Sequence, residues 1–98
     1  MKKQKVVTEI EAGVNRRFFQ AMDALEALGS LRSLSGFCDE VGLSAPRFRE
    51  MRLEYGVAPA PGRVSRYTSL NVEALHYIVK DFGVSGDWLL SGRGKMFR

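Results

Sequence analysis

Histidine and cysteine are nearly absent from this chain, which has one residue of each, His76 and Cys38. A zinc site needs about three or four such ligands, so these two residues cannot form one. His76 has no acidic residue at a spacing typical of a catalytic pair, and Cys38 falls on an apolar face, where cysteine is mostly inert. We therefore expect no metal site, no cofactor and no enzymatic activity.

Long apolar runs are also missing. No segment approaches the roughly 20 apolar residues that span a bilayer, and the start, MKKQKVVTEIEAG, lacks the apolar core of a secretion signal. A single cysteine cannot form an internal disulfide, which fits a reducing compartment. We expect a cytoplasmic protein that does not contact membranes. The 98 residues suffice for one domain, and their 45% hydrophobic content is ordinary for a globular protein.

The sequence does contain an uneven distribution of charge, with a net charge of +4. Three lysines and no acid lie in residues 1–5, whereas residues 6–42 have three arginines against six acids. Residues 43–68 have five arginines against two glutamates. A basic segment of this kind is typical of a surface that binds a polyanion. The alternative is that these arginines are helix-forming residues on a solvated face.

Apolar periodicity and capping residues predict five helices. We expect a short one around Trp88 and four longer ones at about residues 14–28, 33–41, 45–55 and 70–82. Ser69 is the expected cap of the fourth helix, and residues 1–13 are expected to form a flexible basic tail. Two prolines and two glycines in residues 56–69 exclude regular helix there.

A glycine joins the second and third predicted helices. The apolar residues of the second helix share one face: Leu34, Phe37, Cys38 and Val41. Gly42 is suited to the positive φ that ends a helix, Ser44 is a good N-cap, and Pro46 fits a first turn. The third helix is expected to bury Phe48, Met51 and Tyr55. Two short helices joined in this way describe a helix-turn-helix.

A second motif lies near the end, in the segment GVSGDWLLSGRGKMF at residues 83–97. Ser85 can cap a short helix with Asp87 in its first turn, where negative charge suits the helix dipole. Gly92 is the expected end of this helix. We expect Trp88 to be mostly buried between the fourth and first helices.

Together the two motifs resemble the lambda-repressor-like (phage-repressor or XRE-type) helix-turn-helix family. The resemblance covers about residues 14–97, with Cys38 at a small-residue position before the turn. It implies an all-α, compact five-helix lambda-repressor-like domain over residues 14–98, acting as a sequence-specific DNA-binding transcriptional regulator. Two features depart from the family: Leu34 stands where a phosphate-binding glutamine is usual, and the connection before Phe37 is longer than usual.

The resemblance makes residues 45–55 the recognition helix, which lies in the major groove of double-stranded DNA in this family. Candidate base contacts lie in its early part: Ala45, Pro46, Arg49 and Glu50. Arg49 is suited to the O6 and N7 acceptors of guanine, and Glu50 to the N4 donor of cytosine. Candidate phosphate contacts are basic or hydroxyl-bearing residues: Arg32, Ser33, Ser35, Ser44, Arg47, Arg52, Arg63 and Arg66. The alternative for the charged residues is intrahelical pairing, such as Arg47 with Glu50.

Another class of function is compatible with the same motifs. A protein-interaction module or antitoxin-like accessory protein can keep this fold without reading DNA, and the loss of the usual glutamine favours it. RNA binding is a weaker option, and the charge distribution favours DNA. No dedicated dimerisation segment is apparent, so we expect a monomer or a weak homodimer that uses the surface around the fifth helix, Met96 and Phe97.

Overall fold

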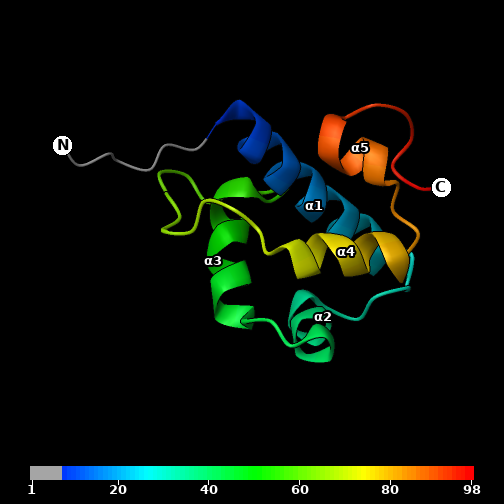
Figure 1. The fold of residues 1–98 in the computed structure, drawn as a ribbon. Helices are drawn as coiled ribbons and strands as arrows, with labels where there is room; N and C mark the ends of the chain where they lie inside the picture. Colours follow the sequence, from blue (N-terminus) through cyan, green and yellow to red (C-terminus); the bar gives the residue numbers. More distant parts are fainter. Residues whose placement is uncertain (1–7) are drawn as a thin grey trace.

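Five α-helices and no sheet make up residues 8–98, the part of the chain that the computed structural model describes (Figure 1). The helices are α1 (Glu9–Ala27), α2 (Leu34–Val41), α3 (Ala45–Tyr55), α4 (Val72–Lys80) and α5 (Gly86–Ser91). Val84 and Phe97 form an isolated antiparallel β-bridge. The Cα radius of gyration is 13.3 Å, close to that expected for a compact domain of this size. The all-α, five-helix prediction is confirmed.

The first helix begins earlier than the sequence analysis placed it. Thr8 and Glu11 form a capping box, in which Thr8 Oγ1 accepts from the Glu11 backbone N–H at 3.1 Å and Glu11 Oε1 accepts from the Thr8 N–H at 3.3 Å. This reciprocal pair satisfies two otherwise free backbone donors. Residues 9–13, expected in the tail, therefore form the start of α1. The rest of the predicted tail, residues 1–7, lies outside the described residues.

The predicted glycine-led turn between α2 and α3 is present. Ser33 caps α2 by accepting from the Gly36 N–H, and Gly42 ends it in the left-handed conformation, with φ of 76°. Ser44 then caps α3 by accepting from the Arg47 N–H, with Pro46 in the first turn. The predicted bounds of α3 are confirmed, and the capping chemistry at its start is displayed in the sequence.

The fourth helix is shorter than expected, by two residues at each end. Asn71, rather than Ser69, is its N-cap residue, and the helix ends at Lys80. Ser69 instead lies in the connection before α4, where its carbonyl oxygen accepts a hydrogen bond from Arg47. A cap assigned from sequence alone cannot take account of this contact with another helix.

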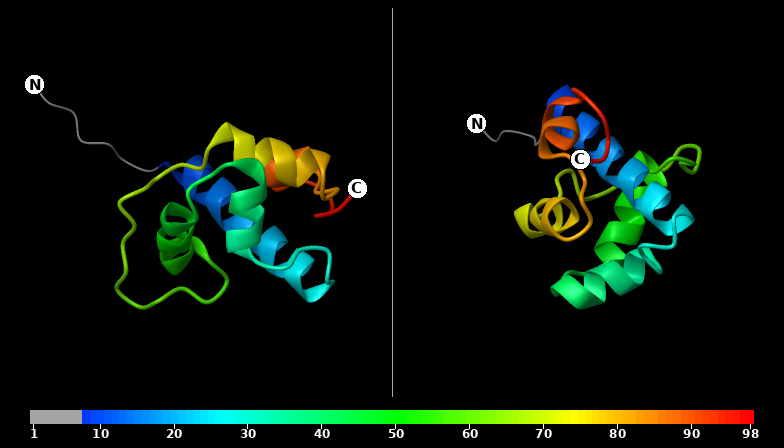
Figure 2. Two further views of the ribbon diagram at one scale, coloured as in Figure 1. Left: turned by 90° about the horizontal axis from the view of Figure 1, so that it is seen from below. Right: turned by 90° about the vertical axis from the view of Figure 1, so that its right-hand side faces the viewer.

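The core forms where α1, α2 and α3 meet. The fully buried ring of Phe18 on α1 lies 6.0 Å from that of Phe37 on α2 and 5.9 Å from that of Phe48 on α3, between ring centroids. α4 packs against α2, and α5 packs against α1 (Figure 2). Burial of these aromatic side chains removes large apolar areas from water and stabilises the packing of the three helices.

Trp88 is mostly buried, as expected, and packs against the edge of the core. Its neighbour Leu89, which the prediction did not single out, is fully buried. Leu89 therefore occupies the more central position on the six-residue α5.

Candidate nucleic-acid interface

The third helix has one buried face and one exposed face, as its periodicity predicts. Phe48, Met51 and Tyr55 are buried and hold α3 against the core. Pro46 and Arg49 are exposed on the other side, and Ala45 is half-buried at the first position of the helix. The early residues of α3 thus offer an accessible surface with one arginine near its centre.

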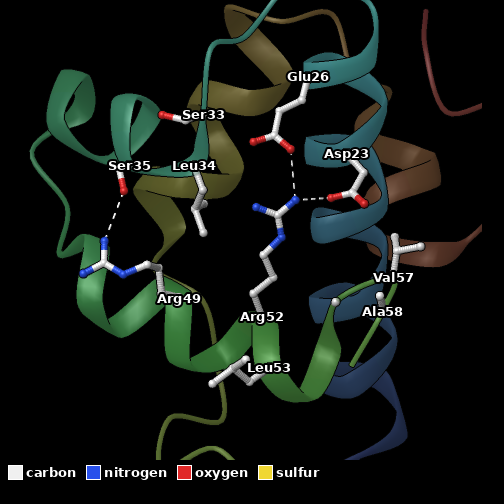
Figure 3. Close-up of a pocket in the computed structure, with 11 residues that line it drawn as sticks. Asp23, Glu26, Ser33, Leu34, Ser35, Arg49, Arg52, Leu53, Val57 and Ala58 are labelled. Atoms are coloured by element: carbon white, nitrogen blue, oxygen red, sulfur yellow. Dashed lines mark hydrogen bonds and ion pairs between the residues drawn. The ribbon is translucent and has the colours of Figure 1, made fainter. Parts of the chain in front are cut away.

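Arg49 connects α3 to the start of α2. Its Nη1 donates to Ser35 Oγ at 3.1 Å, and both residues line a groove between α1, α2, α3 and the residues that follow α3 (Figure 3). The groove has a volume of about 510 Å³. Because the hydroxyl is neutral, this hydrogen bond orients the guanidinium without neutralising its charge.

Arg52 lies deeper in the same groove and is turned toward α1. Its Nη2 forms ion pairs with Asp23 and with Glu26 Oε1, the latter at 3.0 Å (Figure 3). Burial lowers the pKa of Arg52, but hydrogen bonds to Glu26 and Asp23 outweigh this effect and raise its pKa overall. Arg52 was expected to contact DNA phosphate, yet its surroundings are those of a link between α1 and α3.

Glu50 is directed at the long connection between α3 and α4, which runs along the outside of α3 (Figure 2). Its Oε2 accepts from the Arg66 backbone N–H at 2.8 Å and from Arg66 Nε at 3.3 Å, and its Oε1 accepts from Arg66 Nη2 at 3.1 Å. The side-chain hydrogen bond from Arg66 lowers the pKa of Glu50. Glu50, expected to accept from cytosine, is thus engaged within the protein.

Glu54, one turn further along α3, holds the adjacent residue of the same connection. Its Oε1 accepts from the Ser65 backbone N–H at 2.7 Å. At the other end, the buried side chain of Asn15 donates to the Thr68 carbonyl oxygen at 3.1 Å. Glu54 and Asn15 were not among the predicted site residues, although the spacing of Glu50 and Glu54 by four residues indicates that these two share a helical face.

Arg47 and Arg66 both contact the ring of Tyr67. Their guanidinium carbons lie 4.9 Å and 5.5 Å from the ring centroid, a geometry typical of cation–π interactions. Arg47 Nη2 also donates to the Ser69 carbonyl oxygen at 3.3 Å, and its Nε is buried without a hydrogen-bond partner among the described residues. Arg47 is therefore half-buried, and in residues 8–98 Glu50 pairs with Arg66 rather than with Arg47.

The remaining candidates fall into three places. Ser33 and Ser44 use their hydroxyls as helix caps, at the starts of α2 and α3. Arg63 is exposed in the α3–α4 connection, where its positive charge also lowers the pKa of Glu50. Arg32 lines a separate hollow together with Asp39 and Glu40, and that lining includes no residue of α3. Thus the structure gathers Arg47, Arg49, Arg63 and Arg66 around α3 but not Arg32.

The described part of the chain contains neither a metal-binding cluster nor a helix that could span a membrane. Within residues 8–98, no group of three histidine, cysteine or acidic side chains is placed to hold a metal ion. Over the same residues, none of the helices has the length and apolar character needed to cross a bilayer.

Comparison with known proteins adds no identification. The chain matched no protein-family model, and searches of curated proteins and of solved structures found no match either.

Proposed function

We propose that this chain is a sequence-specific, double-stranded-DNA-binding transcriptional regulator with a lambda-repressor-like arrangement, in which α3 enters the major groove. The observation that best supports this is the exposed face of α3, where Pro46 and Arg49 lie opposite the buried stripe. The preceding α2, the turn at Gly42 and the packing of α2 on α4 and of α3 on α1 are compatible with a helix-turn-helix presented to DNA.

Arg49 is the proposed base-reading residue. Its guanidinium is exposed and held by a neutral hydroxyl, so it can exchange the Ser35 contact for the two acceptors of guanine. Arg47 on α3 and Arg63 and Arg66 on the neighbouring connection are the proposed phosphate contacts, which position the protein without reading sequence. The uneven charge of the sequence agrees with this assignment.

A protein-interaction module is the second candidate function, and one observation favours it. Leu34, at the position of the family's phosphate-binding glutamine, has no side-chain hydrogen-bond donor and is only 4% exposed, so it cannot bind a phosphate at the start of α2. The groove beside it also contains the exposed apolar residues Leu53 and Val57. A protein that has lost DNA binding is expected to show such a surface.

Selection of binding sites from random duplexes, followed by fluorescence anisotropy, tests the proposal. Arg49→Ala is expected to weaken binding to the selected site by roughly 1–3 kcal/mol and to relax one base position. Arg93→Ala is the matched control, because it removes the same charge from an exposed position after α5. Binding to neither a selected nor a scrambled duplex below about 100 µM at physiological salt contradicts the proposal and favours the interaction module.

The proposal includes a monomer or weak dimer in free solution. Met96 and Phe97, the expected dimer contacts, are partly buried against the core, and the Met96 carbonyl accepts from the Ser85 N–H at 2.8 Å. These residues therefore offer less free surface than the sequence analysis assumed. Sedimentation analysis that finds a dimer at nanomolar concentration contradicts this part of the proposal.

A further inference from the structure

The pairing of Glu50 with Arg66 leaves one edge of the arginine available. A guanidinium has five N–H donors, and Glu50 accepts from Nε and from one hydrogen of Nη2. Of the remaining donors, one on Nη1 and one on Nη2 form the outer edge of the guanidinium, and they make no hydrogen bond within residues 8–98. The Arg66 side chain is 78% exposed, so this free edge is accessible to a ligand.

The backbone that carries Arg66 is fixed as firmly as its side chain. The Arg66 N–H donates to the same carboxylate, and the preceding Ser65 N–H donates to Glu54. The ring of Tyr67 lies beside the guanidinium and also contacts Arg47. Three neighbouring residues of the connection are therefore tied to α3, and the arginine at their centre has a defined direction.

We propose that Glu50 is a positioning residue, which does not read a base but presents the free edge of Arg66 to the phosphate backbone beside the groove that α3 enters. This inference rests on the proposed function. Double-stranded DNA is the ligand, and a phosphate with two free oxygens matches the two parallel donors of a guanidinium edge. Arg66 then forms a second contact point outside α3, with its orientation set before DNA binds.

Preorganisation and simple charge repulsion predict opposite effects for the removal of Glu50. If Glu50 only repels phosphate, its loss strengthens DNA binding. If it orients Arg66, its loss weakens binding, because the arginine must be ordered when DNA binds. We expect Glu50→Ala to weaken binding by roughly twofold to tenfold, which is the range for ordering one long side chain.

The experiment is a double-mutant cycle on the full chain, with anisotropy titrations of a selected duplex over a range of salt concentrations. The variants are Glu50→Ala, Arg66→Ala and their combination, with Glu40→Ala as the matched control on the exposed surface of α2. Glu50→Gln is included because an amide still accepts one hydrogen bond from the loop backbone but cannot accept both arginine donors. Circular dichroism melting confirms that each variant is folded.

We expect Arg66→Ala to lower the salt slope, the steepness with which the logarithm of the binding constant falls with the logarithm of salt concentration, by about 0.9, the value for one lost phosphate contact. We also expect Arg66→Ala to weaken duplex binding less in the Glu50→Ala background than in the wild-type chain. Glu50→Ala and Glu50→Gln weaken binding, whereas Glu40→Ala leaves it unchanged or strengthens it. Additive effects of Glu50 and Arg66, or tighter binding by both Glu50 variants, overturn the inference while leaving the proposed function intact. A wild-type chain that binds no duplex, or that prefers RNA of the same sequence, overturns both.

Discussion

Arg17 on α1 donates a hydrogen bond from Nε to the carbonyl oxygen of Leu89 on α5 at 2.8 Å, across 72 residues of sequence. The bond places a positive charge at the C-terminal end of α5, where it is favourable to the helix dipole. A β-carbon at Gly92, which ends α5 with φ of 80°, would lie 3.2 Å from Arg17 Nη1. A six-residue helix is not stable alone, so α5 depends on its attachments to the rest of the domain, and Arg17 provides one of them beside the buried Leu89.

Arg17→Met is therefore expected to destabilise the domain. It keeps the aliphatic stem but removes a charged donor to a backbone carbonyl, which costs about 1–2 kcal/mol. In a domain of this size, each 1 kcal/mol corresponds to roughly 4–8 °C in Tm. Thermal unfolding measures the effect, and Arg16→Met is the control, because the adjacent Arg16 is exposed and lies only near the ring of Tyr55. Equal losses in both variants contradict the role given to Arg17.

Leu89 and Trp88 are expected to differ in their importance for stability. Leu89→Ala leaves a cavity in a fully buried position and should cost about 2–5 kcal/mol. Trp88→Ala should cost less, although it removes a larger side chain, because partly exposed atoms have less to lose from truncation. Chemical denaturation of the two variants checks the order. If Trp88→Ala lowers the free energy of unfolding more than Leu89→Ala does, the expected order is wrong and the tryptophan is the more important residue of α5.

The local features of this fold could be predicted from sequence, and the contacts between distant residues could not. The start of α3 follows from Ser44, Pro46 and the glycine turn before it, all within a few residues. The early start of α1 was also encoded locally, in the spacing of Thr8 and Glu11, but the sequence analysis did not use it. A capping box is recognisable without any knowledge of tertiary structure.

The exposed face of α3 could be predicted from the sequence, but the partners of its charged residues could not. The exposed place of Arg49 follows from helical periodicity alone. By contrast, Arg52 pairs with α1 and Glu50 pairs with Arg66, and both partners depend on how separate segments pack. Exposed and half-buried positions on one helix differ by small rotations, so a helical wheel cannot decide which arginine faces solvent and which faces a neighbouring carboxylate.

The thiol of Cys38 is expected to be unreactive in the folded state. Burial, with a smaller contribution from Asp39, raises the pKa of Cys38 from 9.0 to about 11. Because the thiolate is the reactive form, modification by a disulfide reagent at neutral pH should require unfolding. Reaction of the native protein at the rate of the denatured one contradicts this expectation.

The same shift predicts a dependence of stability on alkaline pH. The folded state holds the Cys38 proton more tightly than the unfolded state does. The contribution of the protonated thiol to the free energy of unfolding is therefore fully present below pH 9.0 and is lost as the pH rises toward about 11. Cys38→Ala should therefore show a flatter decline of stability over this range. Denaturation midpoints of the two proteins between these pH values provide the measurement, and parallel declines contradict the assignment.

Arg52 is expected to affect stability rather than DNA binding. Its side chain is 29% exposed and lies between the carboxylates of Asp23 and Glu26, which joins α3 to α1. Because these groups are partly exposed and screened by solvent, Arg52→Ala should cost only about 1 kcal/mol. Its guanidinium is already neutralised within the protein, so the salt slope of duplex binding should not change.

Arg49→Ala is expected to give the opposite result for thermal stability and for duplex binding. Arg49 contacts only a neutral hydroxyl in the described structure, so its loss should leave Tm nearly unchanged while weakening binding to a selected duplex. If Arg52→Ala instead lowers the salt slope by about 0.9, Arg52 leaves its carboxylates to reach a phosphate, and the link between α1 and α3 is broken in the DNA-bound state. If neither measurement changes, the ion pairs contribute nothing measurable, and the buried residues Phe48, Met51 and Tyr55 hold α3 against the core without them.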